Sequence, residues 1–428
     1  NPRGPSRLTA LLALALGLGL FALTVNGSLE RNASNRAAFQ VGADVRVIEG
    51  NYEPPDADAR IRTKLATFAG VEGTTPIYRA NINLNGTSDA GPLTGNLLGI
   101  DPSSWARVAG ATSWRDDYAD TPLATLMTGL RQHQWQGSSA LGDGQIGDAK
   151  HPLWTLVSQS LADTLHLHVG DRFPFEYGQA QPTPSNAQVG AIVQAFPTLY
   201  PNLSQGGYLV VSLPDATAGF IAANGGDPNN IGPSEYWLRT DGSATHQQAF
   251  AAELARDASA LDIVRTVDRR VLEDAIATNP VQVGVRGLLL LGAIVAAALA
   301  LLGSVLQAAL SARQRVVRFA VLRTLGMASR QLTGLLLCEQ LVVYTFGLVG
   351  GTALGLLLAG STLPYLQFGD TTIDPTTLGV PPYVLSIDPA KVAIFYAFLL
   401  GSFALALGAS AFYATTVGLG KALRLGED

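Results

Sequence analysis

The chain has 428 residues, of which 47% are hydrophobic and only 14% are charged, against about 25% charged residues in an ordinary soluble domain. This composition excludes an intrinsically disordered chain and a collagen-like repeat, and the net charge of −5 argues against a nucleic-acid-binding protein that relies on a basic patch. A single cysteine, Cys338, leaves no disulfide framework and no cysteine-rich metal site. The sequence therefore predicts a membrane protein with a large soluble part.

Four runs with little or no charge are long enough, at 1.5 Å per residue, to cross most or all of a hydrocarbon core of about 30 Å. They are residues 8–25, 285–310, 332–360 and 392–417. The first run follows Arg3 and Arg7, as a signal peptide would, but it is longer than the roughly 7–15 apolar residues of a signal-peptide core. We therefore expect four transmembrane α-helices, with both ends of the chain on the same side of the membrane.

Basic residues in short connections predict which side of the membrane is cytoplasmic. Residues 311–330 contain five arginines and no acidic residue, whereas residues 26–284 carry 27 acidic and 17 basic side chains. The first segment is expected inside and the second outside. The expected boundaries are a cytoplasmic N-terminus at 1–7, the first span at 8–25, an extracytoplasmic α+β domain at 26–284, the second span at 285–310, a cytoplasmic helix at 311–331, the third span at 332–360, an extracytoplasmic loop at 361–391, the fourth span at 392–417 and a cytoplasmic tail at 418–428.

Within residues 26–284, short β-like runs alternate with helical stretches, which predicts an α+β fold. Strands are expected at residues 44–48, 208–211 and 234–239, and helices at residues 59–68, 244–261 and 269–277. Residues 180–186, with Pro182 and Pro184, and the Asn- and Gly-rich residues 224–233 are expected to be loops.

The strongest local signal is the basic segment 312–332. Its apolar residues recur at helical spacing beside an arginine-rich face: Val316, Phe319, Ala320, Leu322 and Leu325. Such a helix can lie along the inner membrane surface or dock into a partner's groove, and the pattern leaves both open. Gly326 is expected to end this helix, and Ser329 to cap the next one.

Two features of the third expected span concern packing. Glu339 in an apolar span costs about 3 kcal/mol, so it should face protein or water, or reach back to the cytoplasmic interface. Gly347, Gly351 and Gly355 repeat at four-residue spacing and allow close helix approach, either within the chain or between two copies.

Residues that carry chemistry are sparse. Lys421 follows a glycine but is itself followed by Ala422, so the chain lacks a nucleotide-binding P-loop. His166 and His168 alternate as on a strand, without a third residue at ligand spacing. No nucleophile elbow surrounds Ser158 or Ser160. We therefore expect no catalytic residue, no metal and no cofactor.

Three sequence runs stand out together: Phe319-Ala-Val-Leu-Arg-Thr-Leu-Gly326, Gln331-Leu-x-x-Leu-Leu-Leu-x-Glu339 and the glycine-containing residues 347–355. They resemble the FtsX-like (MacB-type) permease domain of ABC transporters. The order of one span, a large outer domain, a second span, a cytoplasmic helix and two more spans is similar to that family as well. The outer region resembles the family's periplasmic core domain in Gly42-Ala-Asp-Val-Arg-Val, in Val157-Ser-x-Ser-Leu-Ala with Val169-Gly-Asp171, and in Phe196-Pro197.

The resemblance implies a non-catalytic permease subunit whose coupling helix, at about 312–326, sits in a groove of a separate cytoplasmic ABC ATPase. The positions implied in coupling are Arg315, Arg318, Phe319, Leu322, Arg323 and Gly326. At Arg318 the chain departs from the glutamate that the family typically has, which fits either a partner of matching acidic charge or a degenerate half.

The resemblance also implies a setting and a range of functions. It implies a multi-pass protein of the bacterial inner membrane that contacts lipids, binds no nucleic acid and pairs with a second permease copy or half. ATP hydrolysis would drive export or extraction of a lipoprotein, lipid, peptide or antibiotic. The alternative is a membrane-anchored sensor or scaffold that regulates an extracytoplasmic enzyme, such as a cell-wall hydrolase, without translocation.

Overall fold

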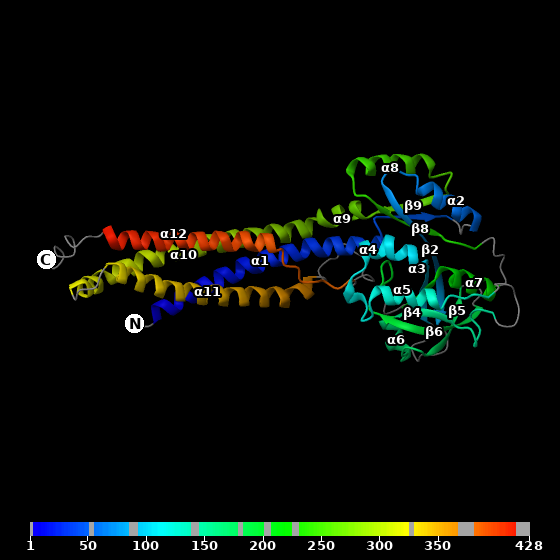
Figure 1. The fold of residues 1–428 in the computed structure, drawn as a ribbon, viewed down its shortest axis with the longest axis horizontal. Coiled ribbons are helices and arrows are strands. Elements are labelled where there is room, and N and C mark those ends of the chain that lie inside the picture. Colours follow the sequence, from blue (N-terminus) through cyan, green and yellow to red (C-terminus); the bar gives the residue numbers. More distant parts are fainter. Residues whose placement is uncertain are drawn as a thin grey trace. The chain divides into compact units, whose positions relative to one another are not determined.

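The computed structural model describes residues 3–50, 55–84, 93–137, 145–178, 183–200, 207–224, 231–324, 329–366 and 381–416 (Figure 1). The chain divides into two compact units. The helical unit comprises residues 1–32, 277–371 and 382–428, and the mixed unit comprises residues 33–276 and 372–381.

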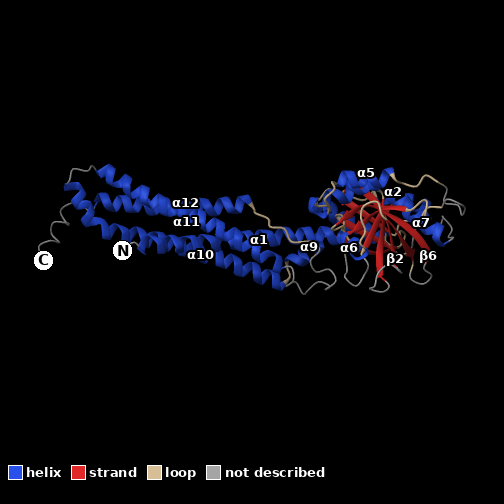
Figure 2. Cartoon of the chain, turned by 90° about the horizontal axis from the view of Figure 1, so that it is seen from below, coloured by secondary structure: helices blue, strands red, loops and turns tan. Residues whose placement is uncertain are grey.

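The described strands of the mixed unit belong to one sheet, drawn in red in Figure 2. They are β1 Val45–Glu49, β2 Val71–Leu84, β3 Leu93–Ile100, β4 Leu153–Ser158, β5 Arg172–Tyr177, β6 Thr183–Val193, β7 Tyr208–Ser212, β8 Glu235–Thr240 and β9 Ile263–Asp268. Their order is β3-β7-β4-β6-β5-β2-β8-β1-β9, and β2 also pairs with β3. Strands β2, β3, β7, β4, β6 and β5 therefore form a closed ring.

Strand β2 belongs both to this ring and to an extension formed by β8, β1 and β9. Its second half is antiparallel to β3, from Ile77 opposite Ile100 to Leu84 opposite Leu93. Its first half is antiparallel to β8, which continues the sheet to β1 and β9. Parallel pairs, β3 with β7 and β4 with β6, occur only inside the ring among the described strands.

Helices of the mixed unit cover the sheet. They are α2 Pro55–Leu65, α3 Pro102–Trp105, the π-helical turn η1 Ala106–Gly110, α4 Ala111–Ser113, the 3₁₀ turn η2 Asp116–Tyr118, α5 Leu123–Gln132, α6 Gln159–Leu165, α7 Leu213–Asn224, α8 Ala244–Asp257 and α9 Arg269–Ala277. Successive strand residues point to opposite faces. Accordingly, Leu156 of β4 lies in the cluster with α3 and α5, whereas Val157 lies in the cluster with α6 and α7. Both faces of the ring are therefore buried.

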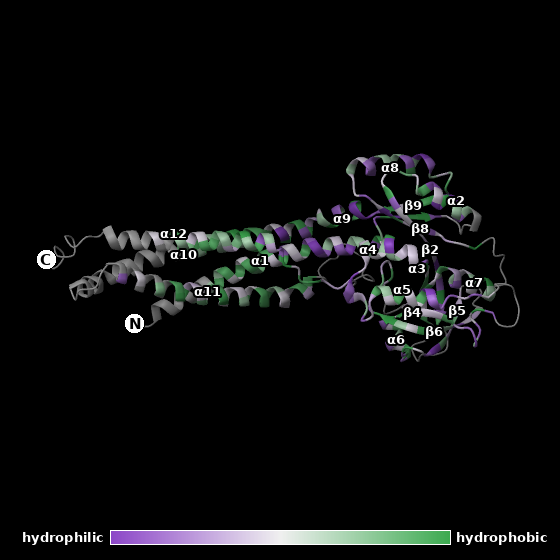
Figure 3. Cartoon of the chain, in the orientation of Figure 1, coloured by the Kyte–Doolittle hydropathy of each residue, from purple (hydrophilic) through white to green (hydrophobic). Residues whose placement is uncertain are grey.

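The helical unit is built from α1 Arg3–Val41, α10 Pro280–Thr324, α11 Ser329–Leu366 and α12 Pro389–Thr416. Helices α10 and α12 pack side by side within it (Figure 1). Among the described residues, three helices are long and apolar enough to cross a membrane, over 13–41, 280–303 and 341–366, and α12 has a shorter apolar stretch at 389–405. Hydrophobic residues accordingly run along these helices in Figure 3.

Helix α1 continues well beyond the expected span at 8–25. Its small residues Ala33 and Ala37 recur at helical spacing and pack against Leu272 and Ile276 of α9. The helix ends at Val41 because Gly42 adopts φ +88°, a left-handed conformation that suits glycine and closes a helix. Residues 33–41 of this helix belong to the mixed unit.

The described helices and strands differ from the expected segments at three places. Helix α10 runs through residue 311 to Thr324 without a break, so the basic segment is not a separate helix in its described part. Helix α11 extends into the expected outer loop, to Leu366. The loop expected at residues 180–186 is wrong from Thr183 onward, where β6 begins. Pro184 is tolerated there because β6 pairs only with β5 at this point and meets β4 from Ala187.

Candidate coupling and packing site

The residues expected to couple with an ATPase lie in the last part of α10. Arg315, Phe319 and Leu322 are spaced by four and three residues in one continuous helix, which places them on one face of it. Arg318 and Arg323 occupy neighbouring positions of the same helical segment. Gly326 lies outside the described residues. Glu339 is in α11, ten residues after the helix begins at Ser329.

Gly351 and Gly355 of α11 face α1. A Cβ atom added to Gly351 would lie 2.7 Å from Leu16 Cβ and 2.9 Å from the Ala13 carbonyl oxygen. One added to Gly355 would lie 2.7 Å from the carbonyl oxygen of Gly17. Only glycine allows the two backbones to approach so closely. Gly351 and Gly355 thus serve a contact within the chain; Gly347 is buried on the same helix.

Aromatic side chains attach α12 to its neighbours. The rings of Tyr344 in α11 and Phe403 in α12 are stacked, with centroids 4.2 Å apart. The hydroxyls of Thr352 and Tyr396 are 2.6 Å apart and share a hydrogen bond. Because hydroxyl groups are costly to bury alone in an apolar bundle, this pairing favours one register of α11 against α12.

A second contact joins α1 to the connector, which we define as residues 382–388 before α12. Asn32 Nδ2 donates to the Val384 carbonyl oxygen at 2.9 Å, and Val384 N donates to Asn32 Oδ1 at 2.9 Å. One turn earlier in α1, Ser28 Oγ accepts from Ser386 N at 2.9 Å and donates to the Thr24 carbonyl oxygen at 2.7 Å. Ser28 and Asn32, four residues apart in α1, therefore bind backbone groups of the connector that a neighbouring strand would otherwise bind.

The connector passes directly into α12. The Asp388 carboxylate accepts from the backbone N–H groups of Ala390 and Lys391, at 3.0 and 3.3 Å, which caps the first turn. Lys391 Nζ lies 2.7 Å from Glu30 Oε2 of α1. The start of α12 is thus tied to α1 by side chains on both sides of the cap.

Ser28 and Asn32 were not among the predicted site residues. Their exposed fractions are 0% and 3%, and the signal that could have found them is polar residues at four-residue spacing, Thr24, Ser28 and Asn32, on the continuation of an apolar helix. The partner backbone lies more than 350 residues further along the chain, so local pattern gives no indication of it.

The mixed unit contains a buried charge cluster at the junction of the ring and its extension. Arg46 Nη2 of β1 and Arg79 Nε of β2 lie 2.7 and 2.8 Å from Glu235 Oε1 of β8. The Trp237 indole N–H donates to Glu235 Oε2 at 3.1 Å. Burial alone would raise the pKa of Glu235, but Arg79 and Arg46 lower it to about 2. The carboxylate is therefore ionised and holds three strands together.

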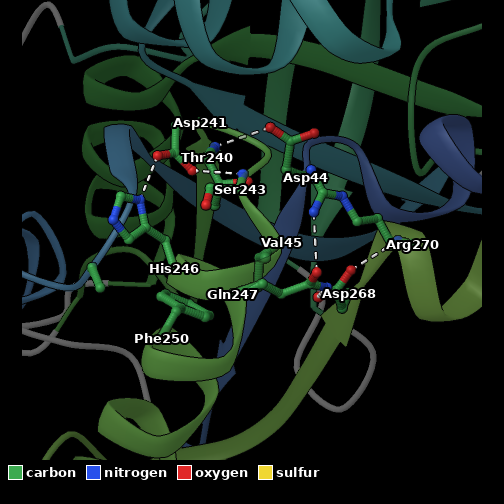
Figure 4. A pocket seen from close by; sticks show the side chains of 11 residues that line it. Asp44, Val45, Thr240, Asp241, Ser243, His246, Gln247, Phe250, Asp268 and Arg270 are labelled. Atoms are coloured by element: carbon green, nitrogen blue, oxygen red, sulfur yellow. Dashed lines mark hydrogen bonds and ion pairs between the residues drawn. The ribbon is translucent and has the colours of Figure 1, made fainter.

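A small polar pocket lies between α8 and the ends of β8 and β9 (Figure 4). Asp241 accepts from Ser243 N at 2.9 Å and from the His246 ring at 2.6 Å, and these two contacts lower the pKa of Asp241. Asp268 accepts from Gln247 Nε2 at 2.9 Å and from Arg270 N at 2.8 Å. Asp241 and Asp268 therefore bind groups of the chain itself. We interpret the pocket as a set of side chains that cap a turn and a helix, and not as a ligand site.

The histidines and serines considered above for metal binding and nucleophilic catalysis take part in local backbone structure. His166 ends α6 in a left-handed conformation, φ 54°, so the strand-like arrangement with His168 is wrong. Ser158 is fully buried, and its Oγ accepts from Leu161 N at 3.3 Å and Tyr208 N at 3.1 Å. In the described part of the chain, no group of three His, Cys, Asp or Glu side chains is placed to hold a metal ion.

Long apolar helices joined in one chain to a folded α+β unit define a membrane protein with a substantial folded domain. Residues 290–419 match the family described as FtsX-like permease C-terminal. The matched segment contains most of α10 and all of α11 and α12.

The chain is also similar to two solved structures. One is the extracellular domain of the noncanonic ABC-type transporter YknZ from Gram-positive bacteria, with 13% identity over 49% of this chain and 91% of that chain and a TM-score of 0.26. The other is the periplasmic region of MacB from Actinobacillus actinomycetemcomitans, with 12% identity over 56% of this chain and 95% of that chain and a TM-score of 0.29. A comparison with curated proteins gave no match.

Proposed function

We propose that this chain is the membrane-spanning permease subunit of an ABC transporter and that a separate cytoplasmic ATPase drives it. The observation that carries the proposal is the FtsX-like match over residues 290–419, which includes the basic end of α10. The proposal includes four spans, formed by α1, α10, α11 and α12, in the bacterial inner membrane, and an extracytoplasmic mixed unit. A second permease copy or half completes the transporter.

The basic end of α10 is the coupling element in this proposal. Arg315, Phe319 and Leu322 present one helical face to a groove of the ATPase, and the flanking arginines meet acidic groups there. Because α10 is one helix of 45 residues, about 68 Å long, a displacement at its basic end is carried to the apolar part without passing through a loop.

Helix α1 is the second element that carries motion. The α11 glycines and the connector both hold it, through the contacts at Gly351, Gly355, Ser28 and Asn32. Since α1 continues as one helix to Val41, and its last nine residues belong to the mixed unit, a shift of α1 acts directly on that unit. We propose that this motion exports or extracts a lipoprotein, lipid, peptide or antibiotic.

The testing experiment measures ATP turnover of the candidate ATPase with this chain in lipid nanodiscs. The wild type is compared with the double variant Phe319→Asp, Arg323→Glu, which inverts one charge and removes the apolar anchor. Stable association and turnover in the wild type, both lost in the variant, would support the proposal. A matched control, Arg31→Glu, inverts an exposed charge on α1 and is expected to leave both intact.

The alternative, a sensor or scaffold without translocation, predicts that no ATPase associates with the chain. Equal ATP turnover with the wild type and with the double variant would contradict the coupling role of α10. Glu339→Gln gives an independent reading, because we propose a mechanical role for this acid within the apolar helix α11. Full coupled activity of that variant would count against such a role for Glu339.

A further inference from the structure

The mixed unit contains a cavity of about 390 Å³ that shares no lining residue with the pocket beside α8. It is lined by residues that follow α5, by the turn before β4, by β6, and by residues at the start of β5 and α7. Its volume is within the about 300–1,000 Å³ that small-molecule sites occupy. Space for a small ligand is therefore present inside one folded unit.

Two aromatic side chains line this cavity side by side. The rings of Trp135 and His151 pack edge to face, with centroids 5.0 Å apart. Asp215 Oδ1 accepts from Trp135 N at 2.8 Å, and Asp148 Oδ1 accepts from His151 N at 2.6 Å. Because these contacts hold the backbone of both residues in place, the aromatic wall is formed before a ligand binds, which lowers the entropic cost of binding.

Three carboxamides line the same cavity, from Gln134, Gln136 and Gln188. Gln134 and Gln188 are half-buried and Gln136 is exposed. Gln188 Nε2 lies 3.4 Å from the Gly170 carbonyl oxygen, which orients that amide. A carboxamide has donor N–H groups and an acceptor oxygen, and a hydroxyl group likewise both donates and accepts. The amides therefore favour a ligand that carries several hydroxyl groups.

The charged groups that line the cavity have both signs. Lys150 and Arg172 are exposed, and Arg172 lies directly opposite Gln188 in the pairing of β5 with β6. Arg172 Nη1 donates to the Ala149 carbonyl oxygen at 2.9 Å, which fixes the guanidinium. Asp215 is the acid among the described lining residues, and it is buried. Because cations and a carboxylate occur together, the lining does not select strongly for an ion of either sign, and its charged groups can form strong hydrogen bonds with hydroxyl groups.

A sugar has the chemistry that fits an aromatic wall, three amides and charges of both signs. A pyranose ring has an apolar C–H face, which packs against aromatic rings, and a rim of hydroxyl groups, which bind amide, guanidinium and carboxylate groups. A hydrocarbon chain would leave these polar groups without partners. We propose that this cavity of the mixed unit binds a saccharide. The inference goes beyond the proposed function, because it requires neither a membrane nor an ATPase.

The test uses the full chain in lipid nanodiscs and measures ligand binding by saturation-transfer NMR, with empty nanodiscs as the blank. The probes are two disaccharides, maltose and diacetylchitobiose, and triglycine as a zwitterion without hydroxyl groups. At least one disaccharide is expected to bind, and Gln188→Ala is expected to weaken that binding about two- to tenfold. Gln194→Ala removes an exposed amide just after β6, outside the cavity lining. It is the matched control, expected within about twofold of wild type.

Substitutions of Trp135 give a second measurement on the same site. Trp135→Ala removes most of the aromatic wall, so disaccharide binding is expected to weaken about tenfold or more. Trp135→Phe keeps an aromatic ring, and intermediate binding is expected. This second variant is used if thermal unfolding shows that Trp135→Ala does not fold.

The proposal is overturned if neither disaccharide binds the wild type. It is also overturned if Gln188→Ala, or the folded Trp135 variant, binds the disaccharide as tightly as the wild type does. Binding of triglycine without binding of either disaccharide would overturn it too, because the cavity would then select a zwitterion. ATPase association is measured separately: its absence would contradict the proposed function and leave the saccharide site standing.

Discussion

Asn32 and Val384 form a closed pair of hydrogen bonds, in which the Asn32 amide both donates to and accepts from the Val384 backbone, at 2.9 Å in each direction. This is the pattern that two paired strand residues make, here between a helical side chain and an extended segment. Ser28 adds the same kind of contact to Ser386, two residues further along the connector. The α1 helix therefore determines where α12 begins.

Replacing Asn32 with alanine should release the connector. Val384 would lose both partners, and the free energy of unfolding of the helical unit is expected to fall by about 1–3 kcal/mol. Hydrogen exchange gives the sharper measurement: the Val384 amide should lose protection while the Ser386 amide keeps it. Asn26→Ala is the matched control, because Asn26 makes only an exposed contact with Glu30 in its own helix; equal exchange at Val384 in both variants would refute this assignment.

A methyl group at position 351 should separate α1 from α11. Gly351→Ala places a Cβ 2.7 Å from Leu16 Cβ, and we expect a destabilisation of about 1–3 kcal/mol, measured as a lower midpoint of thermal unfolding in nanodiscs. Gly360→Ala, in the same helix, meets no atom within 4 Å and is expected to stabilise by about 0.5–1 kcal/mol. Similar midpoints for the two variants would show that the glycine contact does not exist.

Glu235→Gln should destabilise the mixed unit by about 1–3 kcal/mol, because the half-buried Arg46 and Arg79 would lose the anion that they share. The pKa of Glu235 is about 2 in the folded chain and about 4.3 when unfolded. Its contribution is therefore complete above about pH 4.3 and is lost as the pH falls toward 2. The difference in free energy of unfolding between wild type and variant should shrink as the pH falls from about 4.3 toward 2, which chemical unfolding at several pH values measures.

The control for this prediction is Glu72→Gln. Glu72 pairs with Arg239 at 3.2 Å, but both side chains are exposed, so an effect of at most about 1 kcal/mol is expected. A difference between wild type and Glu235→Gln that stays constant from pH 7 to pH 2 would mean that the ion pairs do not account for the loss.

Ser158→Ala should act on stability and on no chemical step. The Ser158 hydroxyl caps α6 through Leu161 N and also accepts from the buried Tyr208 N, so its removal is expected to cost about 1–2 kcal/mol. Ser160→Ala, two residues further and only partly buried, is expected to cost less. The measurement is an esterase assay with activated esters on the wild type and both variants. Activity that is present in the wild type and lost only in Ser158→Ala would contradict the structural role.

Local pattern predicted the elements whose cause is local. The helix at 269–277 has the boundaries of α9, and the strands expected at 44–48, 208–211 and 234–239 overlap β1, β7 and β8. Composition alone likewise marks long apolar helices. Two proline residues predicted a loop at 180–186, but pairing with β5 extends β6 back to Thr183, because an edge position needs no N–H on its free side.

The partners of the candidate site depend on contacts that are distant in sequence. Spacing shows that Gly351 and Gly355 can support a close helix contact, but only the structure identifies α1 as the helix they meet. Ser28 and Asn32 read as ordinary polar residues after a span, and the backbone they bind follows some 350 residues later.

The closed ring of the mixed unit also limits which strands can pair with the sheet of another copy. Every described strand except β9 is paired on both sides over at least part of its length, so β9 is the described strand that is open along one whole side. That edge is six residues long, exposes Arg265, and lies beside a bulge between Ile48 and Glu49 of β1. Copies of the mixed unit are thus less able to join their sheets through this edge.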